Sequence, residues 1–260
     1  MRPIAEFSCE KISVVFTDID DTITKDGVLP AEAYQALWRL YENGFTIVPV
    51  TGRPAGWCEM IARFWPVHGI IGENGAFYFT YHRKNRKMSR YFSNSTSERE
   101  ENSKKLKTLE AEILDQVPGA AVASDQFTRI ADLAIDICED VAPLSEQSID
   151  KIVAIKKKNG AQAKVSSIHV NGWFGSHDKL TACKSYLEQE LSIPWSMRNE
   201  QCAFIGDSPN DEPLFAQFEN SVGVANIKPF LKKLKSPPQF VCDLSHSDGF
   251  CQFVTHLLKK

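Results

Sequence analysis

Three aspartates stand within four residues near the start of the chain, directly after an apolar run. Asp18, Asp20 and Asp21 follow residues 12–16, which have the composition of a buried strand. Carboxylates this close repel one another unless a cation lies between them, and oxygen ligands suit a hard divalent ion such as Mg²⁺. In an open α/β sheet, ligands bind at the carboxyl ends of the strands. The segment therefore predicts a metal-assisted site, although a solvated acidic turn has the same composition.

Later apolar runs end in polar side chains in the same way. The runs that we interpret as further buried strands of this kind are residues 45–50, 69–71 and 202–206. The polar residues that follow them are Thr51, Glu73, Asn74, Asp207, Asn210 and Asp211. Because the carboxyl ends of parallel strands meet at one edge of a sheet, we expect these side chains to converge with Asp18.

Thr51 and Lys179 add a hydroxyl and a cation to this set. The hydroxyl of Thr51 and the N–H groups after it can hold a phosphate oxygen, but the same hydroxyl can cap the next helix. Lys179 falls in the first turn of an expected helix, where a cation opposes the helix dipole. This unfavourable position indicates a role beyond solvation, such as the binding of an anion.

The composition is that of a globular protein. With 260 residues, 43% hydrophobic and 24% charged, the chain is long enough for one large or two modest domains. A net charge of -3 gives no overall field that would favour nucleic acid or an acidic membrane. No stretch approaches the about 20 apolar residues of a membrane span, and the N-terminus lacks the apolar core of a secretory signal. Seven scattered cysteines without a CxxC pair favour buried thiols in the cytoplasm over disulfides or zinc.

The order of elements indicates a parallel sheet with helices on its faces. A helix at residues 31–43, between the first two strands, completes a βαβ unit with a right-handed crossover. Residues 77–91 predict a hairpin with a basic turn. The further helices that we expect are residues 54–65, 176–191, 229–235 and 249–258, and the further strands are 221–225 and 240–242.

The pattern changes after a polar stretch at residues 93–97. The elements that we expect next are helices at 98–116 and 145–159 and strands at 127–138 and 162–170. They form a small α+β unit, inserted between the halves of the parallel sheet, that can cover the site and exclude water. Lys156, Lys157 and Lys158 suit the C-terminal end of a surface helix. We expect a core domain at 1–84 and 175–260 and an inserted cap domain at 85–174.

Taken together, the motifs closely resemble those of the haloacid dehalogenase-like (HAD) phosphohydrolase superfamily. They stand in the family's order: DIDDT at 18–22, VTGR at 50–53, Lys179, and GDSPND at 206–211. The last resembles the GDxxND form of the type IIB branch, the Cof-like and sugar-phosphate phosphatases, and ENGA at 73–76 resembles a turn of that branch. Asp21 stands where many relatives have glycine. The resemblance covers essentially the whole chain. It implies an α/β fold with a Rossmann-like parallel-sheet core and an inserted α+β cap of C2 type.

The resemblance also implies a role for each motif. Asp18 would be the nucleophile that forms an aspartyl-phosphate, and Asp20 would be the general acid and base. Thr51 and Lys179 would bind the non-bridging phosphate oxygens and complete the catalytic set. The residues implied in substrate binding are Thr51, Gly52, Arg53, Glu73, Asn74, Lys179 and Asn210.

Mg²⁺ is the cofactor that the resemblance implies. Its ligands would be the carboxylate of Asp18, the backbone carbonyl of Asp20, and Asp207, with Asp211 and Asn210 in or just behind that shell. Thr22 would shape the turn rather than take part in the chemistry.

These roles point to a Mg²⁺-dependent phosphatase of a small phosphorylated metabolite, with a sugar phosphate as the first choice. The alternatives are a phosphomannomutase-like mutase and a non-catalytic phosphosugar-binding protein. The sequence shows no clear cluster of cap arginines that could hold a bisphosphate, which argues against a mutase. The cap residues that can decide the substrate, or can simply pack or be solvated, are Arg129, Asp132, His169, Asn171, Trp173 and His177. We expect a cytoplasmic monomer or weak homodimer whose partner is a small molecule rather than nucleic acid or a membrane.

Overall fold

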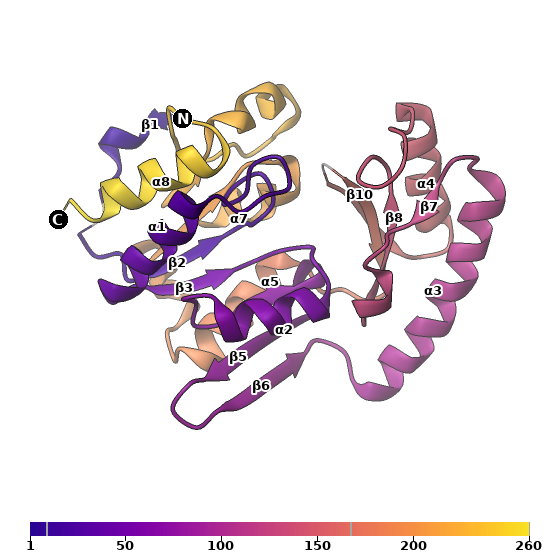
Figure 1. Cartoon of the computed structure of the whole chain (residues 1–260), viewed down its shortest axis with the longest axis horizontal. Coiled ribbons are helices and arrows are strands. Elements are labelled where there is room, and N and C mark those ends of the chain that lie inside the picture. The colour runs from indigo at the N-terminus through magenta and orange to yellow at the C-terminus, as the bar shows by residue number, and fades with distance from the viewer. Residues whose placement is uncertain (9, 167, 260) are drawn as a thin grey trace.

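Two units of different size lie side by side in the computed structural model (Figure 1). The model describes residues 1–8, 10–166 and 168–259. The larger unit, the core, holds both chain termini on the side away from the smaller unit, the cap (Figure 1). Cys9, one of the seven cysteines, and Ser167, within the strand expected at 162–170, lie outside the described residues.

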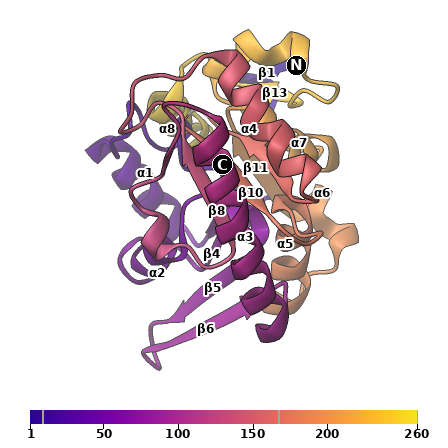
Figure 2. The same ribbon diagram turned by 90° about the vertical axis from the view of Figure 1, so that its right-hand side faces the viewer.

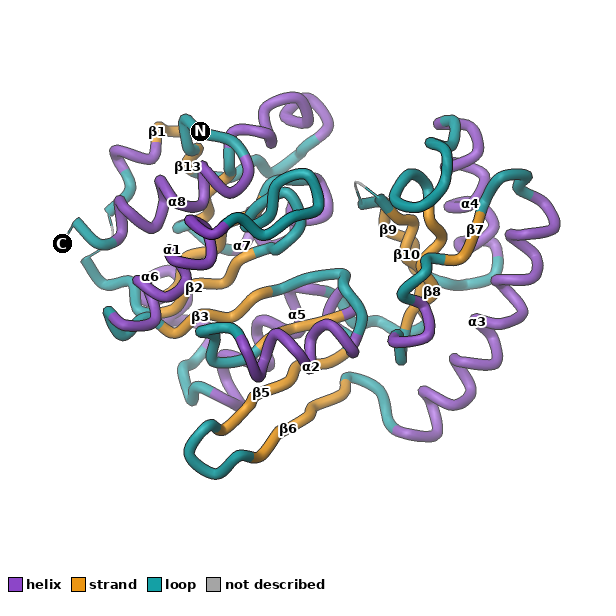
Figure 3. Tube along the Cα trace, in the orientation of Figure 1, coloured by secondary structure: helices purple, strands orange, loops and turns teal. Residues whose placement is uncertain are grey.

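The core is built on a six-stranded parallel sheet in the order β1-β13-β12-β11-β2-β3. Its strands are β1 (Arg2–Pro3), β2 (Val14–Thr17), β3 (Thr46–Pro49), β11 (Cys202–Gly206), β12 (Ser221–Gly223) and β13 (Phe240–Val241). Every residue of β2 and β11 is buried, as expected of short apolar runs covered on both faces. The predicted α/β class with a parallel-sheet core is confirmed. The loops after β2 and β3 lie on the side of the core that faces the cap (Figure 3).

Helices cover both faces of this sheet. They are α1 (Ala31–Glu42), α2 (Ala55–Phe64), α5 (Lys179–Ser185), α6 (Arg198–Gln201), α7 (Glu212–Gln217) and α8 (His246–Leu257). Leu37 of α1 and Phe253 of α8 pack in one apolar cluster, and Cys183 of α5 and Leu214 of α7 pack in another on the opposite face. The segment expected as a helix at 229–235 is a 3₁₀ segment, Ala225–Lys233.

A second, three-stranded sheet continues the core beyond β3. Its strands are β4 (Ile70–Gly72), β5 (Phe77–His82) and β6 (Lys87–Phe92), and a single bridge between Val50 and Ile71 joins it to the main sheet. The boundary expected between residues 84 and 85 falls in the turn of the β5–β6 hairpin. Because β6 stays paired with β5, and Met88 and Phe92 pack on the main core, we propose a boundary after Phe92.

The cap is a four-stranded antiparallel sheet, β7-β8-β10-β9, with two helices on one face. Its elements are α3 (Thr96–Gln116), β7 (Ala121–Val122), β8 (Asp132–Asp136), α4 (Glu146–Lys158), β9 (Gln162–Val165) and β10 (His169–Trp173). Leu109 of α3 and Ile152 of α4 pack against Ile135 and Val170 of the sheet. In Figure 2 the cap faces the viewer, with both helices in front of the strands. The other face of the sheet is therefore turned toward the core.

Two expectations about cap strands were wrong. The strand expected at 162–170 is a hairpin of β9 and β10, because the hydroxyl of Ser166 accepts a hydrogen bond from the His169 N–H (3.0 Å) and turns the chain. The strand expected at 127–138 is confined to β8, since Gln126–Thr128 form a 3₁₀ turn. Serine-based turns of this kind leave no mark on the hydrophobic periodicity.

Lys156 also departs from the expected surface position. Its side chain is fully buried, and its amine donates hydrogen bonds to the carbonyls of Leu133 (2.8 Å) and Val170 (2.9 Å) in adjacent strands. Gly172 makes room for it, because a Cβ there would lie 2.5 Å from Lys156 Cδ. Lys157 and Lys158 are exposed, as expected.

Of the six cysteines that the structure describes, Cys58, Cys183, Cys202, Cys242 and Cys251 are free thiols. Four are buried, Cys138 is exposed and Cys251 is partly buried; the buried ones are Cys58, Cys183, Cys202 and Cys242. Across the described parts of the chain, we find no helix with the length and apolar character that a membrane span requires.

Candidate active site

A buried cluster of three carboxylates lies at the carboxyl edge of the main sheet. Asp18 follows β2 and Asp207 follows β11, and these strands pair in parallel so that their ends lie together. One ligand oxygen from each of Asp18, Asp207 and Asp211 lies within 4.8 Å of the others. Lys179 Nζ donates to Asp18 Oδ1 and to Asp211 Oδ1, both at 2.8 Å. The structure thus brings together four of the residues that the sequence placed in one site.

The charges of this cluster do not balance. Burial raises the pKa of the Asp18 carboxyl to about 7, and burial together with Asp18 and Asp211 raises the pKa of Asp207. Burial also opposes the charge of Lys179, but the attraction of Asp18 and Asp211 outweighs it and raises the pKa of the lysine. One lysine cannot neutralise three carboxylates. A donor set of buried carboxylate oxygens with excess negative charge fits Mg²⁺, which prefers oxygen ligands.

The loop after β11 is folded around Asp211. Asp211 Oδ2 accepts hydrogen bonds from the N–H groups of Asp207 (3.2 Å) and Ser208 (3.4 Å). Gly206 is required here, because a Cβ would lie 2.4 Å from Asp211 Oδ2. Asn210 lines the neighbouring cavity, and its buried Oδ1 has no hydrogen-bond partner among the described residues.

Two further side chains hold Asp207, and one of them was not predicted. Thr22, expected only to shape the turn, donates from its hydroxyl to Asp207 Oδ1 (3.3 Å). Asn226 donates from Nδ2 to Asp207 Oδ2 (3.2 Å) and to the carbonyl of Asp21 (3.0 Å). Asn226 lies just beyond the end of β12. Its signal in the sequence is the same as that of Asp207, a polar residue that follows an apolar run, here residues 221–225.

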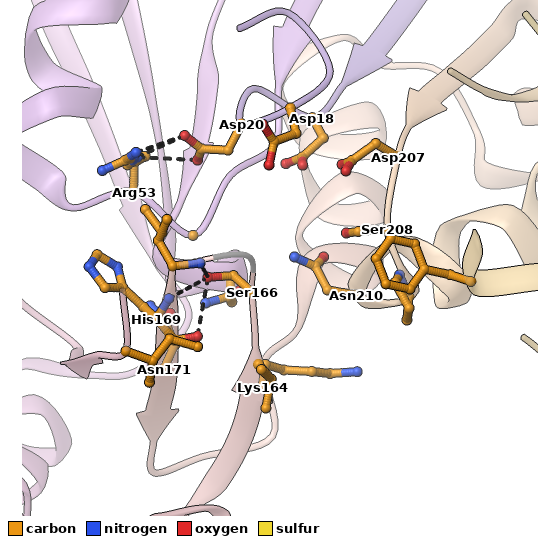
Figure 4. Close-up of a pocket in the computed structure, with 18 of the residues that line it drawn as sticks. Asp18, Asp20, Arg53, Lys164, Ser166, His169, Asn171, Asp207, Ser208 and Asn210 are labelled. Carbon is orange, nitrogen blue, oxygen red and sulfur yellow. Dashed lines mark hydrogen bonds and ion pairs between the residues drawn. The ribbon is translucent and has the colours of Figure 1, made fainter. Parts of the chain in front are cut away.

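Asp20 turns its side chain away from the acidic cluster and toward Arg53 (Figure 4). Arg53 donates to Asp20 Oδ1 from Nε (3.0 Å) and from Nη2 (2.9 Å). The carboxylate of Asp20 is therefore engaged with the arginine, which leaves its backbone carbonyl as the group to consider for a metal.

Arg53 connects the core to the cap. Its Nη1 donates to Glu139 Oε1 of the cap (3.2 Å) and lies 4.0 Å from Asp125 Oδ2, and its guanidinium lies over the ring of Trp57 at 4.5 Å. Burial disfavours the charge of the guanidinium, but Asp20 and Glu139 outweigh burial and raise its pKa. We expected Arg53 to bind substrate, and it does line the cavity. Its guanidinium is, however, already bound by Asp20 and Glu139.

The turns after β3 and β4 supply a hydroxyl, from Thr51, and an amide, from Asn74. Thr51 is fully buried, and its Oγ1 accepts a hydrogen bond from the Arg53 N–H (3.0 Å). Asn74 has a left-handed backbone (φ 55°), and its buried Nδ2 has no partner among the described residues. Gly52 packs against the Asn74 side chain, because a Cβ at position 52 would lie 3.2 Å from Asn74 Nδ2. An unpaired buried donor in a strained turn is a feature typical of ligand sites.

With this geometry established, the comparison with known proteins is decisive for the family. The profile of the haloacid dehalogenase-like hydrolases matches residues 15–254. The chain belongs to this family. The resemblance drawn from the motifs is thereby confirmed. No curated protein sequence matches the chain significantly.

Several solved structures share this fold along nearly the whole chain. A protein from Thermoplasma acidophilum has a TM-score of 0.72 and 19% identity, with 95% of this chain and 99% of that chain covered. A putative HAD/COF-like hydrolase from Plasmodium vivax has a TM-score of 0.69 and 18% identity, with 95% of each chain covered. The sucrose-phosphatase of Synechocystis, in complex with sucrose and phosphate, has a TM-score of 0.63 and 18% identity, with 99% and 98% covered. At these identities the likeness shows the fold alone.

Glu73, within the HAD-like ENGA turn, does not face the cavity, contrary to its expected place in substrate binding. Its side chain is fully buried and accepts hydrogen bonds from four backbone N–H groups. One belongs to Ala55 at the start of α2 (3.0 Å), and three belong to the cap residues Ile130 (3.0 Å), Ala131 (2.6 Å) and Asp132 (3.1 Å). Glu73 therefore fastens the cap to the core.

A cavity of about 630 Å³ separates the two units above the acidic cluster. Of the six cap residues considered for specificity, three line it: Arg129, His169 and Asn171. Asp132 lies behind them and accepts hydrogen bonds from Arg129 Nη1 (3.0 Å) and Asn171 Nδ2 (2.8 Å). Trp173 and His177 stack on each other, with ring centroids 5.6 Å apart, and do not line the cavity. His169 Nε2 lies 2.9 Å from Glu139 Oε2, beside the Arg53 contact.

Proposed function

We propose that the protein is a Mg²⁺-dependent phosphatase that hydrolyses a small phosphorylated metabolite in the cytoplasm, with a sugar phosphate as the first choice. The observation that carries the proposal is the buried Asp18 carboxylate. It is held by Lys179, lies among oxygen ligands for a metal, and opens onto a cavity roofed by the cap. The fold that the chain shares with the sucrose-phosphatase of Synechocystis supports the choice of a sugar phosphate.

Asp18 would attack phosphorus and form an aspartyl-phosphate as the bond from phosphorus to the alcohol oxygen breaks. Lys179 and the Thr51 hydroxyl would hold the non-bridging oxygens, and the unpaired Asn74 amide is a further donor. Mg²⁺ held by Asp18, Asp207 and Asp211 would offset the repulsion between the carboxylate and the phosphate.

Asp20 would donate a proton to the leaving alcohol and then take a proton from the water that hydrolyses the aspartyl-phosphate. Its contact with Arg53 fixes the orientation of the carboxylate at the cavity edge. Since Arg53 also binds Glu139 of the cap, the position of the cap and the orientation of Asp20 are linked. A closed cap would keep bulk water from the aspartyl-phosphate until the alcohol leaves.

Phosphate release from a panel of sugar phosphates tests the proposal. The wild-type protein with Mg²⁺ should release phosphate from at least one ester, and Asp18→Asn should release none. Asp26→Asn, at an exposed acid in the next turn, is the matched control and should behave as wild type. No release from any ester, or equal release by Asp18→Asn, would show the proposal to be wrong.

Analysis of the sugar phosphates that remain in the same reactions distinguishes the two alternatives. A mutase would produce an isomeric sugar phosphate without free phosphate, and a binding protein would retain the ester unchanged. No observation favours a mutase, because Arg129, the arginine that the cap contributes to the cavity lining, is already bound by Asp125 and Asp132.

A further inference from the structure

Exposed apolar side chains from both units line the cavity. Val165, at the end of β9, belongs to the cap and is 43% exposed. Phe230, in the 3₁₀ segment Ala225–Lys233, belongs to the core and is 36% exposed. Both line the cavity. Lys164 and Ser166, the neighbours of Val165 in the chain, lie across the cavity from Asp18 and Asp207 (Figure 4).

Three further apolar side chains line the cavity from the cap. Ile137 is buried in the apolar cluster of the cap, and Ile149 of α4 packs against that cluster. Both also line the cavity, together with Ile168 at the hairpin turn. We call these five lining residues the apolar wall of the cavity: Ile137, Ile149, Val165, Ile168 and Phe230. Apolar surface left exposed beside a cavity marks a place for an apolar ligand group.

The polar groups of the cap offer little to a sugar rich in hydroxyls. None of the described cap residues that line the cavity is a carboxylate. Arg129 is bound by Asp125, Asp132 and the carbonyl of Gly52, and Asn171 Nδ2 is bound by Asp132. A hydroxyl without a partner loses its hydrogen bonds to water on binding, so a further polyol group is unfavourable beside these cap residues.

Two more polar side chains of the cap lie against groups of the protein. The Ser166 hydroxyl bonds to the backbone of His169 (3.0 and 3.2 Å), and the His169 ring lies 2.9 Å from Glu139. Lys164 is exposed, and no carboxylate among the described residues lies within ion-pair distance of it. The cavity therefore offers apolar contacts and the cations of Lys164 and Lys233, but few fixed hydrogen-bond partners on the cap side.

We propose that the alcohol released at Asp18 carries an apolar alkyl or aryl group, which packs between Phe230 of the core and the β9–β10 hairpin of the cap. This inference rests on the proposed phosphatase function and narrows its substrate from a free sugar phosphate to a phosphorylated glycoside or similar ester. Because Phe230 and Val165 come from different units, the apolar group binds fully only when the cap is closed. The binding energy of the apolar group is then available to favour closure of the cap over the core.

Matched esters measure this contact directly. The sugar phosphate that is turned over fastest in the panel is prepared as its methyl and its phenyl glycoside, so that the two differ only in the apolar group. Phosphate release with Mg²⁺ gives kcat/KM for each. The phenyl ester should exceed the methyl ester by at least about tenfold, since hydrophobic contacts of even one or two carbon atoms discriminate by roughly 10–200-fold.

Substitutions test whether the apolar group of the ester contacts Phe230 and Val165. Phe230→Ser and Val165→Ser should each lower kcat/KM for the phenyl ester more than for the methyl ester, so that their ratio falls toward one. The matched control is Phe127→Ser in the cap, because Phe127 is 88% exposed and does not line the cavity. This control should keep the wild-type ratio.

The outcomes separate the two proposals. Equal kcat/KM for the two esters, or a wild-type ratio in Phe230→Ser, would overturn the apolar site while the phosphatase function stands. No phosphate release from any ester of the panel would overturn the phosphatase function and, with it, the apolar site.

Discussion

The Asp207 carboxylate is held in place by neutral donors that do not cancel its charge. Thr22 donates to one of its oxygens and Asn226 to the other. Asn226 is itself fixed, because its Oδ1 accepts a hydrogen bond from the His246 N–H (2.9 Å). A metal ligand oriented in this way needs less reorganisation when the ion binds.

Asn226→Ala should therefore weaken the binding of Mg²⁺ without removing a ligand. Loss of an outer-shell partner of this kind typically costs 10–100-fold in metal affinity or activity, so we expect the Mg²⁺ concentration for half-maximal phosphate release to rise by at least about tenfold. The readout is a Mg²⁺ titration of phosphate release. Asn85→Ala, in the exposed β5–β6 turn, is the control. An unchanged titration curve for Asn226→Ala would contradict the role assigned to it.

Lys156 has a different kind of constraint, since it is a titratable group in an apolar interior. Burial lowers the pKa of its amine to about 7, with Asp132 favouring the charged form and Arg129 opposing it. A neutral amine still has two N–H groups, which match the two carbonyls that it contacts. The unfolded chain would keep the proton up to the ordinary pKa of lysine, near 10.4.

Lys156 should therefore make the protein more stable as the pH rises from about 7 toward 10. In this window the unfolded state binds one more proton than the folded state, so the unfolding free energy rises by up to about 1.4 kcal/mol per pH unit. Lys156→Met removes this proton and should flatten that rise. Urea unfolding of both proteins between pH 7 and 10 measures the difference, because other titrating groups are common to both. Parallel pH profiles would refute the assignment.

At the scale of elements, residues 12–16 and 202–206 show why the core was predictable. Their apolar runs are continuous because the strands are covered on both faces. Because a helix lies between successive parallel strands in the chain, each connection is a crossover that is expected to be right-handed. The same logic brought Asp18, Asp207 and Asp211 to one edge. These inferences needed only local sequence and general sheet geometry.

The residues that escaped prediction depend on partners distant in the sequence. Lys156 looked like a surface lysine because Gly172, which makes room for it, belongs to strand β10 and not to its own helix α4. Glu73 looked like a ligand-binding residue because its partners at Ile130–Asp132 lie in the cap. Such pairings are fixed by tertiary structure, which one sequence without its structure does not reveal.

Glu73→Gln should loosen the attachment of the cap. The amide nitrogen would face backbone N–H groups, so at least one of them would lose its acceptor, which costs about 1–3 kcal/mol for a buried group. We expect a lower unfolding free energy in urea and faster hydrogen exchange at Ile130, Ala131 and Asp132. Glu100→Gln, on the exposed face of α3, should leave both unchanged. Exchange at wild-type rates in Glu73→Gln would show that Glu73 does not hold the cap.

For the whole molecule, the cap is fastened to the core on one side and held by an ion pair on another. Glu73 binds the backbone of the cap at 130–132, and Arg129 Nη1 donates to the carbonyl of Gly52 (3.0 Å). The Arg53–Glu139 pair instead joins the two units next to Asp20. His169 and Arg53 together lower the pKa of Glu139 to about 2, against the effect of burial, so the pair stays charged across the physiological range.

Glu139→Gln should therefore favour an open cap. A hydrogen bond between charged groups contributes about 1.5–3 kcal/mol, so we expect KM for the preferred ester to rise by about tenfold, and the radius of gyration in solution scattering to increase. Glu146→Gln makes the same change at an exposed position of the cap helix α4 and should alter neither. Because Arg53 keeps Asp20 as a partner, the variant should fold as wild type. A compact Glu139→Gln with wild-type KM would mean that the cap is held closed without this pair.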